Sequence, residues 1–105
     1  MSNPWRGDVA LVIDGQRCVM RLTLGALASL EAALQVGTLV DLVQRFEGGA
    51  FSSHDVMALL GAGLEGGECP VDPATLGKAV IEGGPMAGAR AAAELLARAF
   101  VLPEA

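Results

Sequence analysis

The chain has 105 residues, enough for one domain with a modest core, and we expect a single domain over residues 1–105. Hydrophobic residues make up 52% of the sequence, but no uninterrupted apolar run approaches the ~18 residues of a membrane-spanning helix. The formal net charge is −5, and the seven Lys and Arg residues form no cluster. Because phosphate contacts need grouped basic side chains, this charge pattern disfavours nucleic-acid binding.

The N-terminus and the cysteines favour a cytoplasmic protein. Residues 1–5 lead into no apolar segment of the kind found in a secretory signal peptide. Cys18 and Cys69 lie far apart in the sequence and lack metal-ligand spacing. In a reducing compartment we expect two free thiols rather than a disulfide, and no cluster of ligand residues predicts a metal or a cofactor.

The first predicted element is a β-hairpin. Asp14-Gly15 separates two apolar-rich runs, and both central residues of a type I′ turn need positive φ, which makes Asp-Gly a strong hairpin signal. The apolar face of this hairpin, which is nearly all apolar, carries Val9, Leu11, Ile13, Gln16, Cys18, Met20 and Leu22. The mixed face carries Ala10, Val12, Arg17, Val19 and Arg21. We expect the apolar face to pack on helices and the outer edges to stay unpaired, because no third strand is evident.

Two helices are predicted next. Thr23 offers an N-cap hydroxyl, and the helix after it should run from about Leu24 to Gln35 and stop at Gly37. Its expected apolar stripe consists of Leu24, Leu27, Leu30 and Leu34. Thr38 caps a second helix that ends at Gly48-Gly49. The apolar residues on one face of that helix are Leu39, Leu42, Val43 and Phe46.

Two further helices begin at capping signals. Ser52 and Asp55 have nearly the spacing of a capping box, and Gly66-Gly67 ends the helix that they start. The apolar stripe of this helix is Val56, Leu59, Leu60 and Leu64. Asp72-Pro73 starts a short fourth helix, because Pro is well tolerated at the first helical position, and Gly83-Gly84 stops it. The apolar residues of the fourth helix are Leu76, Val80 and Ile81.

Pro85 starts the last predicted helix, which runs to about Phe100. Its expected apolar stripe is Met86, Ala89, Ala93, Leu96 and Phe100. Helices follow the single hairpin without a domain boundary or an internal repeat. The predicted fold class is therefore α+β, with an N-terminal β-hairpin packed on four to five short α-helices.

Two motifs that suggest chemistry are better explained as parts of helices. Residues 61–66, GAGLEG, match the GxGxxG pattern of a dinucleotide-binding turn, but a helix precedes them where that turn needs a strand. His54 lies beside Asp55, and adjacent helical side chains point apart, so His54 is interpreted as a polar first-turn residue. A Ser/His/Asp arrangement over residues 52–55 stays open as the alternative. We expect no catalytic residue and no enzyme.

Several short motifs resemble one family. They are RGDV at 6–9, DG at 14–15, RLTLGAL at 21–27, LE at 30–31, RFEGG at 45–49 and LGAGLEGG at 60–67. Together they resemble the small tail protein of bacterial gene transfer agents and related prophages, which is grouped with the phage tail assembly chaperones. The likeness spans most of the chain, at about the usual length of the family.

The resemblance implies a non-enzymatic tail assembly chaperone. Such a protein coats the long, largely helical tape measure protein and hands it over as the tail tube polymerises. The alternative is a structural component that is retained in the tail of the particle. The implied partners are the tape measure protein, the major tail protein and further copies of the chain. The implied location is the bacterial cytoplasm during assembly, or the tail of the phage-like particle for the alternative.

We assign the partner contacts to two surfaces. The mixed face of the hairpin, through Val12, Val19 and Arg21, should mediate contact between copies, since exposed strand edges pair readily. Apolar positions on the last helix, Leu95 and Phe100, should be offered to the tape measure protein.

Overall fold

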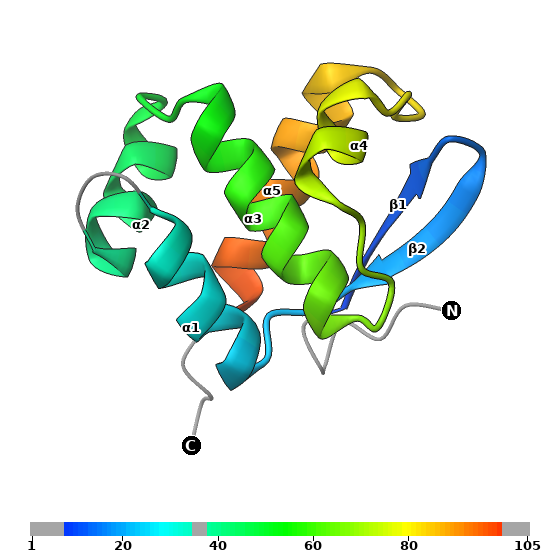
Figure 1. Cartoon of the computed structure of the whole chain (residues 1–105). Coiled ribbons are helices and arrows are strands. Elements are labelled where there is room, and N and C mark those ends of the chain that lie inside the picture. Colours follow the sequence, from blue (N-terminus) through cyan, green and yellow to red (C-terminus); the bar gives the residue numbers. More distant parts are fainter. Residues whose placement is uncertain (1–7, 35–37, 100–105) are drawn as a thin grey trace.

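Figure 1 shows the computed structural model of the chain, which describes residues 8–34 and 38–99. Within these residues the strands are β1 (Val9–Ile13) and β2 (Gln16–Met20). The helices are α1 (Leu24–Ala33), α2 (Leu39–Gly48), α3 (Ser53–Gly66), α4 (Pro73–Lys78) and α5 (Pro85–Ala99). The predicted α+β class, a hairpin packed on short helices, is confirmed.

The hairpin forms as predicted. Asp14 and Gly15 adopt φ values of 50° and 80°, the positive range that the two-residue turn requires. The antiparallel register pairs Val9 with Met20 and Leu11 with Cys18. The buried residues of the two strands are Val9, Leu11, Ile13, Cys18 and Met20. The predicted apolar face therefore covers the core.

Local capping places the helix starts where the sequence predicts them. The hydroxyl of Thr23 accepts a hydrogen bond from the Ala26 N–H at 3.1 Å. Thr38 and Ser52 each form a complete capping box, with Asp41 and Asp55 as the reciprocal carboxylates. Helix α1 ends at Ala33, two residues earlier than expected. The stop that we predicted at Gly37 lies outside the described residues.

Helix α3 is the centre of the molecule. It packs against α1, α4, α5 and β2, and in Figure 1 it crosses the middle of the fold with α5 behind it. Leu59, Leu60 and Leu64 are each at most 2% exposed. The GAGLEG motif lies inside α3, so its interpretation as part of a helix is confirmed.

Two glycines let the hairpin backbone touch the C-terminal end of α3. A Cβ on Gly66 would lie 1.9 Å from the Arg21 carbonyl oxygen, and one on Gly67 would lie 1.8 Å from the Val19 carbonyl oxygen. The Arg21 N–H also donates to the Gly63 carbonyl at 2.9 Å. Any side chain at residues 66 and 67 would push β2 away from α3.

The prediction of an unpaired edge on β1 is wrong. Helix α4 ends at Lys78, and the chain then runs beside the turn end of β1, where Ile81 forms an antiparallel bridge with Ile13. The Glu82 N–H donates to the Val12 carbonyl at 3.0 Å, and the Asp14 N–H donates to the Val80 carbonyl at 2.7 Å. Val80 and Ile81 thus leave the predicted fourth helix, because the backbone groups of Val80 and Glu82 on either side of Ile81 bond to the hairpin.

Two predicted helix stripes are also corrected. In α1 the buried line passes through Ala26 and Leu30, so Leu24, two residues and about 200° from Ala26, points outward and is 85% exposed. In α5 the buried residues are Gly88, Ala91, Ala92, Leu95 and Leu96. Met86 is 65% exposed. The buried face of α5 is thus rotated from the predicted stripe, and small residues such as Gly88 and Ala92 let α5 approach α3 closely.

Candidate partner-binding site

Two strongly exposed apolar side chains lie beside α4 and α5. Among the described residues, the large hydrophobic side chains with high exposure are Leu24, Val40, Val80 and Met86. Val80 and Met86 both line one groove. Scattered apolar side chains are normal on a protein surface, but two at one groove mark a candidate interaction site.

The first groove, called here the α4–α5 groove, lies between α3, α4 and α5 and encloses about 540 Å³. Besides Val80 and Met86, its apolar lining includes Phe51, Val56, Met57, Leu60 and Ala89. Of its described lining residues, none is charged. A groove with this lining favours an apolar occupant, because a charged one would lose its hydration without gaining a partner.

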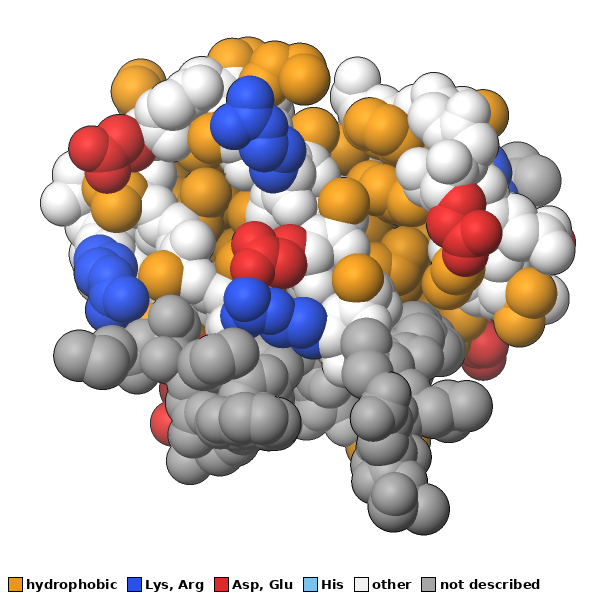
Figure 2. Space-filling view, turned by 180° about the vertical axis from the view of Figure 1, so that it is seen from behind, with side chains coloured by type: hydrophobic (Ala, Val, Ile, Leu, Met, Phe, Trp, Pro, Cys, Tyr) orange, Lys and Arg blue, Asp and Glu red, His pale blue; other side chains and the backbone are white. Residues whose placement is uncertain are grey.

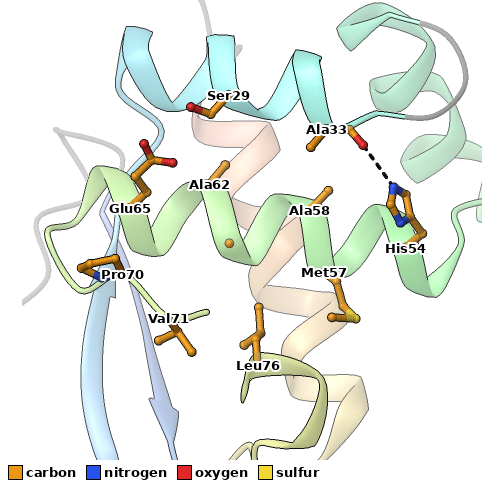
Figure 3. A pocket seen from close by; sticks show the side chains of 11 residues that line it. Ser29, Ala33, His54, Met57, Ala58, Ala62, Glu65, Pro70, Val71 and Leu76 are labelled. Atoms are coloured by element: carbon orange, nitrogen blue, oxygen red, sulfur yellow. Dashed lines mark hydrogen bonds between the residues drawn. The ribbon is translucent and has the colours of Figure 1, made fainter. Parts of the chain in front are cut away.

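A second groove, the α1–α4 groove, encloses about 410 Å³ between α1, α3 and the segment leading into α4. Figure 3 shows Ala58 and Ala62 on its α3 side, and Val71 and Leu76 across from them. The polar side chains of His54 and Glu65 lie toward opposite ends of this stretch of α3. The groove is therefore mainly apolar, with Ser29 on its α1 side and polar side chains at its ends.

The two grooves adjoin. Met57 and Leu76 line both of them. Together they make an apolar band that crosses the molecule from α1 over α3 and α4 to α5. An amphipathic helix binds such a band by laying its apolar face into it. Among the described residues, the helices rather than the hairpin thus provide this extended apolar surface.

The opposite face is less suited to an apolar partner. Figure 2 shows that face, where hydrophobic side chains line hollows between charged ones. The hollow between α2 and α5 encloses about 320 Å³ and has Glu47 in its lining. The hollow between β1 and α5 encloses about 300 Å³ and includes Glu82, Arg90 and Glu94. Both are smaller than the α4–α5 groove and carry charge.

His54 has a structural partner rather than a catalytic one. Its Nε2 lies 3.2 Å from the carbonyl oxygen of Ala33, the last residue of α1, and the dashed line in Figure 3 marks this hydrogen bond. The contact satisfies one of the carbonyls that a helix C-terminus leaves without an internal partner. Within residues 8–34 and 38–99 no group of His, Cys, Asp and Glu is arranged to hold a metal ion.

A partly buried ion pair fixes α2 to the start of α3. Nε and Nη2 of Arg45 each lie 3.0 Å from an oxygen of the Asp55 carboxylate, which also accepts the Ser52 N–H at 2.9 Å. Burial works to raise the pKa of Asp55, but the hydrogen bonds and the Arg45 charge outweigh it, so the pKa is lowered. The pair supports the wall of α3 that forms the grooves.

The hairpin residues predicted as partner contacts have internal roles as well. Val12 and Val19 are half-buried, and their carbonyl oxygens face Glu82 and Gly67, respectively. Nε of Arg21 lies 2.7 Å from Oδ1 of Asp8, and Nη2 lies 3.1 Å from Oδ2. Asp8 is only 3% exposed. Arg21 therefore neutralises a buried carboxylate, which leaves it little freedom to bind a partner.

The two helix residues predicted as partner contacts are not on the described surface. Leu95 is 1% exposed and packs in the core, where a Cβ on Gly63 would meet its Cδ1. We correct its assignment, since a buried side chain is not available to a partner. Phe100 lies outside the described residues. The sequence analysis placed both Val80 and Met86 on the apolar stripes of helices. In the structure Val80 lies after the end of α4, and Met86 lies on an exposed side of α5.

Comparison with known proteins identifies a relationship over nearly the whole chain. A family model described as "Phage tail tube protein, GTA-gp10" matches residues 6–101. This range includes the hairpin and all the helices of the described residues. No curated protein and no solved structure matches the chain. No helix within the described residues is long and apolar enough to cross a membrane.

Proposed function

The chain belongs to the phage tail tube family of GTA-gp10, and from this we propose that it is a tail assembly chaperone that binds an apolar helical segment of the tape measure protein. The proposed binding site is the α4–α5 groove, extended by the α1–α4 groove. The proposal replaces Leu95 by Val80 and Met86 as the contact residues. Binding is non-enzymatic and takes place in the cell while the tail is assembled.

The uncharged α4–α5 groove is the observation that carries this proposal. It has about 540 Å³ of space and Val80 and Met86 at 72% and 65% exposure. Burying these side chains under a partner removes apolar surface from water, at about 25 cal/mol per Å². The chain as a whole carries a net charge of −5, which keeps copies apart and so suits a protein that covers an aggregation-prone partner.

The experiment compares two matched variants in a pull-down of the tape measure protein from producing cells. Met86 is the second residue of α5, and Val40 is the second residue of α2. Their exposures are 65% and 63%. An Asp in the first turn of a helix is well tolerated, so Met86→Asp and Val40→Asp should both fold. They differ in whether the charge falls in the groove.

We expect Met86→Asp to weaken capture of the tape measure protein by about 10-fold or more, which corresponds to at least ~1.4 kcal/mol. Val40→Asp should bind like the wild type. Circular dichroism confirms that both variants keep their helices. Equal capture by the two variants would contradict the proposed site, and no capture by the wild type would contradict the proposed function.

The family description favours a second candidate function, a structural component of the tail tube. In that case the α4–α5 groove would contact neighbouring subunits of the tube. Counting copies of the chain in purified particles separates the two functions. A tube component stays in the particle at high copy number, whereas a chaperone is found with the tape measure protein in cells and is lost from the particle.

A further inference from the structure

Two cysteines that are far apart in the sequence meet in the folded chain. Cys18 and Cys69 are separated by 51 positions, yet their Sγ atoms lie 2.6 Å apart and share a hydrogen bond. A disulfide bond measures about 2.05 Å, so the sulfurs need to approach by only about half an ångström to be bonded. Both cysteines are free thiols in this structure.

The backbone on each side of this contact is held in place by other interactions. Cys18 lies on β2 and is paired with Leu11 of β1. Cys69 follows α3, and its N–H donates to the Leu64 carbonyl at 2.8 Å. Gly67, two residues before Cys69, lies directly against the backbone of β2. The two sulfurs are therefore brought together by rigid elements, which favours a bond that requires little rearrangement.

The two thiols differ in how accessible they are to a dissolved reagent. Cys18 is 4% exposed, whereas Cys69 is partly exposed. Burial, together with the hydrogen bond and charge of Cys69, raises the pKa of the Cys18 thiol to about 11. A dissolved oxidant therefore reaches Cys69 first, and Cys18 is placed to resolve the resulting adduct.

We propose that Cys18 and Cys69 form a redox modification site that a small-molecule disulfide, such as glutathione disulfide, closes to an intramolecular disulfide. The Cys69 thiolate attacks one sulfur of glutathione disulfide, giving a mixed disulfide and one glutathione thiolate. The Cys18 thiolate then attacks the Cys69 sulfur and displaces the second glutathione thiolate. The chain loses two hydrogen atoms in total, and the reagent is reduced to two glutathione molecules.

The bond would tie the hairpin to a wall of the α1–α4 groove. Pro70 and Val71, which line that groove, directly follow Cys69. Thiols persist in a reducing cytoplasm, whereas an oxidising medium outside the cell favours disulfides. The site thus gives the chain a reduced state in the cell and a cross-linked state after release. The chemistry of the cysteine pair holds for either candidate function, whereas the cross-linked state after release applies to a chain that stays in the particle.

The test incubates dilute, folded wild-type protein with glutathione disulfide, blocks the remaining thiols under denaturing conditions, and measures intact mass. We expect a monomer that has lost two hydrogens and carries no glutathione. Trypsin digestion without reduction should yield peptide 18–21 joined to peptide 46–78. Dithiothreitol should restore both thiols. A wild-type protein that keeps two thiols, accumulates glutathione on Cys69, or forms only bonds between chains would overturn the proposal.

Two single variants separate the roles of the cysteines. Cys18→Ser should take up one glutathione on Cys69 and keep it, because the resolving thiol is missing. Cys69→Ser should stay unmodified at Cys18, because that thiol is buried and Cys69 is no longer there to deliver the adduct. If Cys69→Ser reacts as fast as Cys18→Ser, the assigned order of attack is wrong. The wild-type mass measurement stands even where a variant fails to fold.

Discussion

Single glycines decide how closely the hairpin approaches α3. Gly61 and Gly66 both lie in α3, but their surroundings differ. A Cβ on Gly61 meets nothing within 4 Å, whereas one on Gly66 meets the Arg21 carbonyl at 1.9 Å. A backbone oxygen cannot move away from a new Cβ as the end of a flexible side chain can. Position 66 therefore has room only for glycine.

We therefore predict opposite effects of the same substitution within one helix. Gly66→Ala should lower the free energy of unfolding by about 2 kcal/mol, since β2 must shift away from α3. Gly61→Ala should raise it by about 0.5–1 kcal/mol, because alanine restricts the unfolded chain and favours the helix. Urea titration followed by circular dichroism measures both. Two variants of equal stability would contradict the close contact between α3 and β2.

Asp55 predicts a pH-dependent contribution to stability. Its pKa is lowered in the folded chain despite its burial, because Arg45 and Ser52 donate hydrogen bonds to the carboxylate. A lowered pKa stabilises the fold at any pH above the unfolded value of about 3.9, and this stabilisation is lost as the pH falls through the folded value. Arg45→Met should therefore lower the free energy of unfolding by about 2 kcal/mol at neutral pH.

The loss of unfolding free energy caused by Arg45→Met should become smaller in acid, where the Asp55 carboxyl is protonated in both proteins. Thermal unfolding at pH 7 and at an acidic pH below the lowered folded-state pKa of Asp55 measures the change. Arg90→Met, at an exposed position of α5, serves as the control and should change little at either pH. A cost that is the same at both pH values would show that the ion pair is not its source.

The hairpin turn and the segment after α4 support each other. The Asp14 carboxylate accepts the Val80 N–H at 2.8 Å, and Asp14 itself has a φ of 50°. Asp14→Ala should lower the free energy of unfolding by about 1–2 kcal/mol, because it removes the hydrogen bond and places alanine at a strained positive φ. Asp14→Asn keeps an acceptor and tolerates that φ, so it should stay within about 0.5 kcal/mol of the wild type. Equal melting temperatures for the two variants would contradict this link.

Elements set by local chemistry were predictable from the sequence. The turn at Asp14-Gly15 and the caps at Thr23, Thr38 and Ser52 depend on residues within three or four positions of one another. The pairing of Ile81 with Ile13 was not predictable, because it joins segments that the hydrophobic pattern does not relate. The burial of Leu95 rests similarly on where α3 comes to lie, which periodicity within α5 does not reveal.

The candidate site escaped prediction for the same reason. The α4–α5 groove is lined by residues from before α3 through to α5, from Phe51 to Ala89. Its two exposed large hydrophobic members, Val80 and Met86, look like core residues when only helical periodicity is considered. The resemblance of short motifs did predict a tail protein of a phage or gene transfer agent, and the family match over residues 6–101 confirms it.

Cross-linking through the cysteine pair would act on the molecule as a whole. A bond between Cys18 and Cys69 closes a loop of about 50 residues, and restricting that loop in the unfolded chain stabilises the fold by up to about 4 kcal/mol. The oxidised wild type should therefore unfold at a higher urea concentration than the reduced wild type. Oxidant should leave the midpoint of the Cys18→Ser variant nearly unchanged. A lower midpoint for the oxidised wild type would show that the bond distorts the fold.

The central claim is that the apolar band over α3, α4 and the start of α5 binds the tape measure protein. Hydrogen exchange of the chain, alone and in complex with that protein, tests it most directly. We predict slower exchange on binding in peptides covering residues 76–89, with little change in peptides covering α2. Protection confined to the hairpin, or no protection at all in a complex that has demonstrably formed, would contradict the claim.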